Sequence, residues 1–321
     1  MDLSLIIPVY NEEENIPPLY QAILDAMRQL GGSWEVVLVD DGSKDGSLAA
    51  LERIVAADPA HVRVVALRRN FGQTAAIAAG IDYSCGEIVV LLDADLQNDP
   101  ADIQIMVQKI HEGYDVVSGW RKNRQDTYLT RTLPSNLANW LISWVTGVHL
   151  HDYGCTLKAY RREVLTGFRL YGEMHRFIPV FANQVGARLV EVEVHHHARR
   201  FGKAKYGLER TFKVILDLFT VKFLTSYANK PIYLFGGTGV VLMLLGVLVL
   251  LYLFIRKIFL AVSVTTSPLF ILSTMMAVMG FQSILLGLIA ELLARTYHES
   301  QGKPTYTVLR VINIDGKQPA F

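Results

Sequence analysis

Alternation of strand and helix patterns through residues 1–120 is the feature that most constrains the fold of this chain. Short apolar runs typical of buried strands recur between segments whose apolar residues are spaced as on one face of a helix. Such alternation favours parallel strands joined by crossover helices, so we predict an α/β domain with a mostly parallel sheet. The expected strands are Leu3–Val9, Trp34–Asp40, Val62–Arg68 and Glu87–Leu92, and the expected helices are Ile16–Leu30, Gly46–Ala57 and Thr74–Ser84.

Two long stretches without charge near the C-terminus predict a membrane anchor. Residues Ile232–Ile255 carry no charge and would span about 35 Å as a helix, enough to cross a bilayer core. The uncharged stretch Ile258–Ala290 exceeds one crossing, so we place the second span at Pro268–Leu292 and the connecting turn at Ala261–Ser267. Two buried helices of a soluble core are the alternative.

The basic residues around these spans indicate their orientation. The connection between the spans carries only Arg256 and Lys257. More basic residues flank the outer ends of the spans: Arg210, Lys213, Lys222, Lys230, Arg295, Lys303 and Arg310. This bias puts both termini in the cytosol. A strand pattern follows Met1 at once, so we expect no signal peptide.

Charge and cysteine content narrow the classes of function. The net charge of +1 argues against a protein that binds nucleic acid or other polyanions. The two cysteines, Cys85 and Cys155, provide neither a disulfide framework nor metal-ligand spacing, which fits a reducing compartment.

Two carboxylates end the apolar strand pattern at Glu87–Leu92. Asp93 and Asp95 stand two residues apart, and the carboxamide of Gln97 follows two residues later. Ligands of open α/β sheets bind just beyond the carboxyl ends of such strands. Mg²⁺ and Mn²⁺ prefer oxygen ligands, typically one or two carboxylates together with substrate phosphates. The pattern therefore indicates a metal–diphosphate site, and a solvated acidic turn is the alternative.

Polar clusters also follow the other three predicted strands. They are Tyr10-Asn11-Glu12-Glu13-Glu14-Asn15, Asp40-Asp41-Gly42-Ser43 and Arg68-Arg69-Asn70-Phe71-Gly72-Gln73. Structural roles are the alternatives to ligand binding: Asn15 would cap a helix, and Asp41-Gly42 would make a turn. Parallel strands bring all these ends to one edge of the sheet, which favours a single site. No Gly-x-Gly-x-x-Gly and no Gly-x-x-x-x-Gly-Lys occurs, so phosphate neutralisation would fall to a metal and basic side chains.

Together these motifs resemble those of a known family. Pro8-Val-Tyr10-Asn11-Glu12, Val39-Asp40-Asp41-Gly42-Ser43, Asn70-Phe71-Gly72 and Asp93-Ala94-Asp95-Leu96-Gln97 are similar to the motif set of inverting family 2 glycosyltransferases with the GT-A fold. More narrowly, the chain resembles the polyprenyl-phosphate glycosyltransferases, such as dolichol-phosphate mannose synthases and bactoprenol glucosyltransferases. The resemblance covers residues 1 to about 230 and extends to paired C-terminal spans.

The resemblance implies roles for individual residues. Asp95 and Gln97 would ligate Mg²⁺ or Mn²⁺, and Arg131 with Ser135 would grip the acceptor phosphate. Asp95, Arg131 and Asp152 would form the catalytic set, with Asp152 orienting the acceptor or acting as base. A turn-forming role for Asp152 is the alternative. The residues implied in binding the nucleotide sugar are Pro8, Tyr10, Glu12, Val39, Asp41, Asp93, Ala94, Arg121, Arg199 and Lys205.

Arg199 and Lys205 lie in a segment that is similar to the family's basic loop, Arg-x-x-Gly-x-Ser-Lys-Tyr. This chain departs from that pattern at Ala204, where Ser is usual. Sugar transfer places growing negative charge on the leaving diphosphate, and a metal with basic side chains would stabilise that charge. An acceptor phosphate monoester has a second pKa of about 6 and is mostly ionised at neutral pH, so it needs positioning more than deprotonation.

These observations predict the inverting transfer of one sugar from a nucleotide sugar to a polyprenyl phosphate, here undecaprenyl phosphate. Asp40-Asp41 is compatible with uracil or guanine, and we favour UDP-glucose over a GDP-sugar. A processive polysaccharide synthase is an alternative, disfavoured by the absence of Gln-x-x-Arg-Trp and by only two spans. A non-catalytic membrane scaffold with a degenerate domain is another, disfavoured by the intact Asp93, Asp95 and Gln97.

The expected organisation has four segments. They are a cytosolic GT-A catalytic domain at 1–207, an amphipathic juxtamembrane helix at 208–230, two transmembrane helices at 231–292 and a cytosolic tail at 293–321. We expect an integral protein of the bacterial inner membrane, in contact with the lipid bilayer, and a homo-oligomer.

Three further features carry structural expectations. His195-His196-His197 is expected at the end of a strand and in the following loop, because consecutive residues on a strand alternate faces and do not converge on one ion. Asn136–Val145, with Trp140 and Trp144 four residues apart, would lie at the membrane interface or pack in the core. Thr305–Ile314 alternates partly like a strand, and would add an edge to the cytosolic domain or to a neighbouring subunit.

Overall fold

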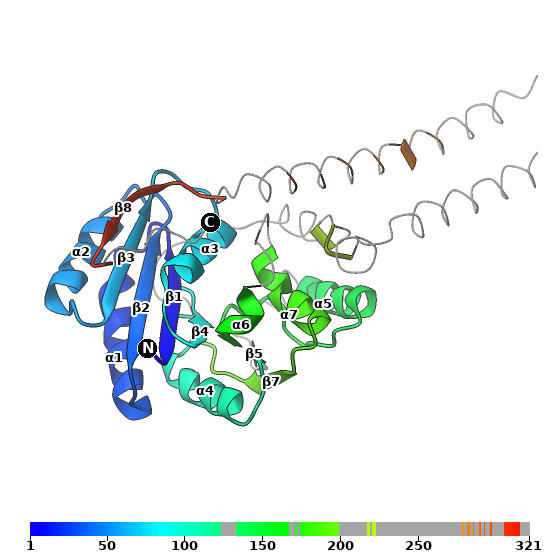
Figure 1. Ribbon diagram of the computed structural model, residues 1–321, viewed down its shortest axis with the longest axis horizontal. Coiled ribbons are helices and arrows are strands. Elements are labelled where there is room, and N and C mark those ends of the chain that lie inside the picture. The colour runs from blue at the N-terminus through cyan, green and yellow to red at the C-terminus, as the bar shows by residue number, and fades with distance from the viewer. Residues whose placement is uncertain are drawn as a thin grey trace, which may run out of the picture. The chain divides into compact units, whose positions relative to one another are not determined.

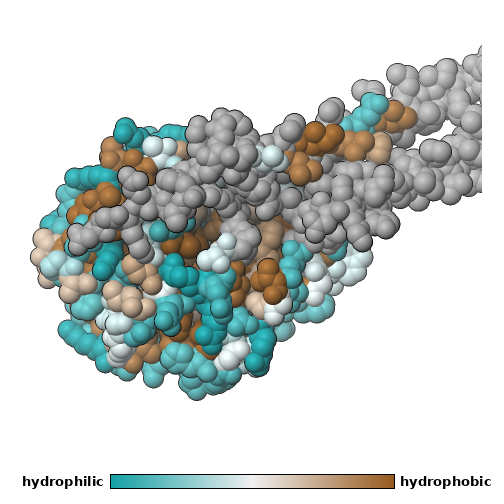
Figure 2. Space-filling view, viewed as in Figure 1, coloured by the Kyte–Doolittle hydropathy of each residue, from teal (hydrophilic) through white to brown (hydrophobic). Residues whose placement is uncertain are grey.

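The computed structural model describes residues 1–122, 133–166, 174–198 and 305–314, with single residues or short pieces at 170, 172, 217–218, 220–222, 278, 281–282, 285, 289, 292 and 296. Two compact units are distinguished, one formed by Met1–Leu218 with Lys303–Phe321 and the other by Phe219–Gly302. The fold below is that of the first unit. On the face that Figure 2 shows, its described surface mixes hydrophilic and hydrophobic areas.

The predicted membrane spans fall almost wholly outside the described residues, and so do the predicted segment boundaries at 207 and 230. In the part of the chain that is described, no helix has both the length and the apolar character needed to cross a bilayer.

One mixed, mostly parallel sheet organises the first unit (Figure 1). Its order among the described strands is β7-β5-β6-β4-β1-β2-β3-β8. Neighbouring strands run parallel in β1–β2, β1–β4, β2–β3 and β5–β7, and antiparallel in β3–β8, β4–β6 and β5–β6. The strands are β1 (Leu3–Val9), β2 (Trp34–Asp40), β3 (Val62–Leu67), β4 (Ile88–Leu91), β5 (Val116–Trp120), β6 (Lys158–Arg161), β7 (Leu189–Glu193) and β8 (Val308–Ile312).

Helices cover both faces of this sheet. Alternate residues of the strands pack against α1, α2 and α4 on one face, and Val37, Val39 and Val65 pack with α3 on the other. Burial on both faces explains why β1 and β2 are almost continuous apolar runs. The helices are α1 (Ile16–Leu30), α2 (Ser47–Ala57), α3 (Gln73–Tyr83), η1 (Pro100–Asp102), α4 (Ile103–His111), α5 (Leu133–Thr146), α6 (Arg162–Leu165), η3 (Met174–Phe177) and α7 (Ile178–Gln184).

The seven elements expected from the sequence through residue 92 are confirmed, with ends that differ by at most one residue from the predicted ones. The expectation that the tail adds a strand is also confirmed. β8 pairs antiparallel with β3 of the same chain and forms the edge of the sheet (Figure 1). Asn313 Nδ2 donates to the carbonyl of Val62 at 2.7 Å, and Tyr306 Oη donates to Asp82 at 2.7 Å. These contacts return the C-terminal tail to the α/β unit.

A buried carboxylate ties the amino ends of three strands together. Glu35 on β2 accepts from Ser4 Oγ of β1 at 2.6 Å and from the backbone N–H of Cys85 at 2.5 Å. It also pairs with Arg63 Nε of β3 at 3.1 Å. Because Glu35 is fully buried, its charge depends on these partners.

We predict that Glu35→Ala lowers the free energy of unfolding by about 3 kcal/mol. The change leaves Arg63, the Ser4 hydroxyl and the Cys85 N–H without their acceptor. Denaturant unfolding of the purified protein measures this. Glu52→Ala, which removes the exposed partner of Arg310, is the matched control and should change stability by less than about 1 kcal/mol. Equal effects of the two variants would contradict the assignment.

Candidate active site

The carboxyl ends of β1, β2 and β4 meet at one edge of the sheet, because β1 lies between the other two in parallel. Backbone bonds join the segments that follow. The N–H of Asp41 donates to the carbonyl of Val9 at 2.8 Å, and the N–H of Asn11 donates to Ser43 Oγ at 3.0 Å. Pro8 and Val39 lie directly opposite each other in the β1–β2 ladder. The structure thus brings the first two predicted nucleotide-binding segments together.

Asp41 links the end of β2 to the Asn70-Phe71-Gly72 motif. Its carboxylate accepts from the backbone N–H groups of Phe71 at 2.7 Å and Gly72 at 2.9 Å. Burial raises the pKa of Asp41 to about 6, although the two backbone hydrogen bonds act in the opposite direction. Gly42 follows with φ of +67°, and a Cβ there would lie 2.4 Å from the backbone of Arg69. Asp41-Gly42 therefore makes a tight turn and also anchors a second loop.

Glu12 is buried in the segment after β1 and accepts from Asn15 Nδ2 at 2.6 Å. The N–H of Glu12 donates to Ser47 Oγ at the start of α2 at 2.9 Å. Asn15 stands at the N-cap position of α1 but makes no side-chain capping bond. The alternative that the Asn15 side chain caps α1 is therefore wrong. That side chain donates to Glu12 instead. Tyr10, two residues before Glu12, is half-buried at the same edge.

Asp93 is held from two sides. Gln73 Nε2, at the start of α3, donates to Asp93 Oδ1 at 2.7 Å, and Thr156 Oγ1 donates to Asp93 Oδ2 at 2.6 Å. The sequence marks Gln73 only as part of a polar cluster, and no pattern in it singles out Thr156. The two contacts fix one carboxylate between elements that are far apart in the chain.

Ala94 and Asp95 are buried, and Gln97 is half-buried. The backbone N–H of Gln97 donates to Asp95 Oδ1 at 3.2 Å, and Leu96 between them has φ of 59°. No cluster of three or more His, Cys, Asp or Glu in the described ranges could hold a metal. Carboxylate and amide oxygens in this arrangement instead fit Mg²⁺ or Mn²⁺ held by one or two protein groups together with a substrate diphosphate.

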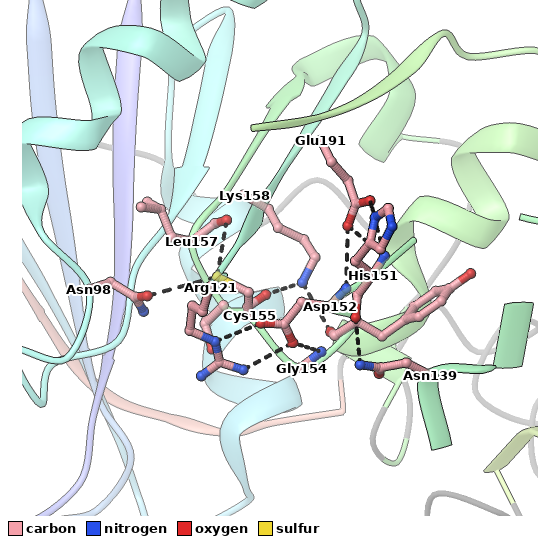
Figure 3. Close-up of polar contacts among 12 residues, drawn as sticks. Asn98, Arg121, Asn139, His151, Asp152, Gly154, Cys155, Leu157, Lys158 and Glu191 are labelled. Carbon is pink, nitrogen blue, oxygen red and sulfur yellow. Dashed lines mark hydrogen bonds and ion pairs between the residues drawn. The ribbon is translucent and has the colours of Figure 1, made fainter. Parts of the chain in front are cut away.

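Arg121 and Asp152 form a bidentate ion pair (Figure 3). Arg121 Nε donates to Asp152 Oδ2 at 2.8 Å, and Nη2 donates to Oδ1 at 3.1 Å. The backbone N–H of Gly154 donates to Asp152 Oδ1 at 3.1 Å. Asp152 therefore also has the turn-forming role that was the alternative to a catalytic one. Burial by itself would lower the pKa of Arg121, but the charge and hydrogen bonds of Asp152, together with smaller effects of Cys155 and Asp93, raise that pKa overall. The pair is therefore a fixed cation and anion.

The turn that carries Asp152 is braced on several sides (Figure 3). Glu191 on β7 accepts from the backbone N–H of His151 at 2.8 Å and from its Nδ1 at 2.8 Å. Asn139 Nδ2 on α5 donates to the carbonyl of His151 at 2.8 Å. Lys158 is buried in β6 and donates to the carbonyls of Tyr153 and Cys155, and burial lowers its pKa. Sequence reasoning missed Glu191 and Lys158, although a lysine inside a strand pattern is a signal that could have found Lys158.

Helix α5 lies next to this turn and carries Ser135, which is half-buried near its start. No residue of α5 is charged. Its Asn139, Ile142 and Ser143 are buried, whereas Trp140 and Trp144 are 62% and 72% exposed. The two indole rings stack with centroids 6.4 Å apart. Of the two alternatives for these tryptophans, core packing is therefore wrong. Arg131, Arg199 and Lys205 lie outside the described residues.

The fold is that of a GT-A α/β domain, and its polar residues gather at the carboxyl ends of parallel strands, where ligands of such sheets bind. Residues 4–168 match the family Glycosyl transferase family 2, and the chain belongs to that family. It is a glycosyltransferase.

Relatives of known activity match almost the whole chain. Identity to a dodecaprenyl-phosphate galacturonate synthase from Rhizobium johnstonii is 43% over 316 residues, covering 98% of this chain and 94% of the relative. Identity to an undecaprenyl-phosphate 4-deoxy-4-formamido-L-arabinose transferase from Proteus mirabilis is 36% over 313 residues, covering 97% and 94%. Among solved structures, glucosyl-3-phosphoglycerate synthase from Mycobacterium tuberculosis, in complex with Mn²⁺ and UDP-glucose, shares the fold. Its TM-score is 0.51 at 19% identity, covering 70% of this chain and 78% of that one.

We predict that the KM for the nucleotide donor rises as the pH falls through about 6. Asp41 is a carboxylate above that pH and a carboxylic acid below it, and the acid is the weaker acceptor for Phe71 and Gly72. Asp41→Asn should show a raised donor KM already at pH 7.5 and should lose this pH dependence. Initial rates from pH 5 to 8 measure both. A flat wild-type profile, or the same acid limb in Asp41→Asn, would contradict the assignment.

Proposed function

We propose that this protein transfers one sugar, with inversion, from a nucleotide sugar to a polyprenyl phosphate at the cytoplasmic face of the bacterial inner membrane. One observation carries the proposal. Two relatives that match nearly the full chain are named for different sugars, but both are named for a polyprenyl-phosphate substrate. The shared part of their activity is the lipid phosphate, so that part is the best supported for this chain.

The sugar is the less determined half of the reaction. The sequence favours UDP-glucose, whereas the relatives are named for galacturonate and for 4-deoxy-4-formamido-L-arabinose. We propose a UDP-linked pyranose as donor, and UDP-galacturonate is the candidate to test beside UDP-glucose.

The residues at the sheet edge suit the donor half of the chemistry. The ends of β1 and β2, with Asp41 and Glu12, would hold the nucleoside, and Asp93 would contact the nucleotide. Asp95 and Gln97 would hold Mg²⁺ or Mn²⁺, which would supply charge stabilisation at the leaving diphosphate. Arg199 and Lys205 would add basic side chains from the predicted loop. In the transfer, the bond from the anomeric carbon to the diphosphate oxygen breaks, and a phosphate oxygen of the acceptor forms the new bond on the opposite face.

The Arg121–Asp152 pair supports a positioning role for Asp152. Its two carboxylate oxygens already accept three hydrogen bonds, two from Arg121 and one from the N–H of Gly154, so the group is committed to holding these partners. A strong base is not needed, because a phosphate monoester with a second pKa of about 6 is mostly ionised at neutral pH. We propose that Asp152 fixes the Arg121 guanidinium at the reaction centre, while Arg131 and Ser135 grip the acceptor phosphate.

The surface of α5 supports a membrane acceptor. An uncharged helix that exposes two tryptophans suits the boundary between water and lipid, because the indole ring is apolar with one polar N–H. We propose that α5 contacts the bilayer, together with the juxtamembrane segment 208–230, and that spans within 231–292 anchor the protein. Assembly into a homo-oligomer remains a prediction.

The direct test uses the full-length protein with undecaprenyl phosphate, Mn²⁺ and either UDP-glucose or UDP-galacturonate. We expect mass analysis of the lipid product to show one added sugar, and we expect excess EDTA to abolish transfer.

Asp95→Ala should lower kcat by about 100-fold or more, because the cation would lose a ligand. Asp25→Ala, at an exposed carboxylate of α1, should match the wild type. Undiminished transfer in EDTA would contradict the metal assignment, and products with several sugars would favour the processive alternative.

Tryptophan fluorescence tests the contact between α5 and the bilayer. The chain has four tryptophans, and Trp34 and Trp120 lie in the strands of the sheet. In nanodiscs, brominated lipids should quench the emission of the wild type and of Trp34→Phe. The double variant Trp140→Phe/Trp144→Phe should lose this quenching, because brominated chains quench only rings that contact them. Equal quenching of the double variant and the wild type would contradict the proposal.

A further inference from the structure

The segment after β7 runs antiparallel to the segment that follows Asp95. The backbone N–H of His197 donates to the carbonyl of Gln97 at 2.8 Å, and Asn98 and His196 form an isolated antiparallel bridge. One step further, the backbone N–H of His195 donates to Asp102 Oδ2 at 2.6 Å. The backbone of the three histidines is therefore bonded to the chain after Asp95, at Gln97, at Asn98 and at the side chain of Asp102.

Two histidine rings reinforce this pairing. His195 Nδ1 lies 2.7 Å from Asp102 Oδ1, and His197 Nε2 lies 3.0 Å from Asp99 Oδ2. We call these four residues the histidine clasp. The side chains of His195 and His197 are 76% and 49% exposed, and ion pairs that exposed add little to global stability. The effect of the clasp is therefore local, on the segment between Gln97 and Asp102.

The residue just before Gln97 has a backbone conformation that needs support. Leu96 has a left-handed φ of 59°, which is uncommon for a residue with a branched apolar side chain. Such conformations persist only where the surroundings determine them. The carboxylate of Asp95, before Leu96, accepts from the N–H of Gln97, after it, and the carbonyl of Gln97 accepts from the backbone N–H of His197. Both peptide groups of Gln97 are thus held, and His197 provides one of the two contacts.

We propose that His195 and His197 are positioning residues for the cation of the donor diphosphate, which they affect by fixing the backbone of Gln97 beside Asp95. The inference rests on the proposed function, because it takes Asp95 and Gln97 as the groups that hold the cation. The histidines do not themselves ligate the ion. The rings face the carboxylates of Asp99 and Asp102, which lie two and five residues beyond Gln97.

The test measures Mn²⁺ binding directly, by titrating the electron paramagnetic resonance signal of free Mn²⁺ against full-length protein with UDP present. We expect His195→Ala/His197→Ala to bind Mn²⁺ about tenfold more weakly than the wild type, as for other residues that support a metal ligand. At saturating Mn²⁺ its kcat should approach the wild-type value, because the reacting groups are unchanged. His195→Gln/His197→Gln, which retains an N–H donor at each position, should recover most of the affinity.

His61→Ala is the matched control. It removes a histidine–aspartate contact of 2.9 Å to Asp58, near the start of β3 and away from the carboxyl edge. It should leave Mn²⁺ affinity unchanged. If the double alanine variant does not fold, the Mn²⁺ affinities of His197→Ala and His197→Gln are compared instead.

The outcomes separate this inference from the proposed function. Wild-type protein that binds no Mn²⁺ with UDP, or Asp95→Ala that binds it normally, would refute the metal assignment itself. Wild-type binding that is lost in Asp95→Ala but unchanged in the clasp variants would overturn the clasp and leave the proposed function standing. Weaker binding in the alanine variant, with recovery in the glutamine variant, would support the clasp.

Discussion

The parallel placement of β1 between β2 and β4 is the constraint on which the rest of the site depends. Because the three strands point the same way, the segments after Val9, Asp40 and Leu91 meet at one edge. The polar groups there mostly bond to one another across segments, as Asp41 does to the 71–72 backbone. The strands that carry this edge are buried on both faces. The loops of a glycosyltransferase can then present carboxylates without a glycine cradle for phosphate.

A second part of the candidate site lies beyond β4, where the sheet includes an antiparallel strand. There the antiparallel β6 lies between β4 and β5, and the turn before it carries Asp152 against Arg121. Thr156 reaches from the segment after that turn to Asp93, so one hydrogen bond connects the two parts. A carboxylate committed to a guanidinium suits a reaction whose nucleophile is already ionised. In the proposed reaction, the donor edge would stabilise the charge on the leaving diphosphate, and the Arg121–Asp152 pair would position the reacting groups.

The sequence predicted the elements through Leu92 well, because their apolar spacing is regular and each lies in one βα unit. It also predicted that the polar strand ends converge, since parallel topology requires this. It did not predict the partners of those groups. Thr156 and Glu191 act through contacts between distant segments, and no local pattern encodes them. Lys158 bonds to carbonyls three and five residues away, and only a lysine within a strand pattern signals it. Asn15 shows the converse, because its position suggested a cap while its side chain bonds to Glu12.

The central claim is that the ends of β1, β2 and β4 bind a nucleotide diphosphate through a cation held by Asp95. A structure of the full-length protein in nanodiscs with Mn²⁺ and UDP tests it most directly. The account predicts the uridine against the segments that contain Tyr10 and Asp41, with the Mn²⁺ between the diphosphate and Asp95. Nucleotide bound elsewhere, or bound at this edge with the Mn²⁺ away from Asp95, would contradict it.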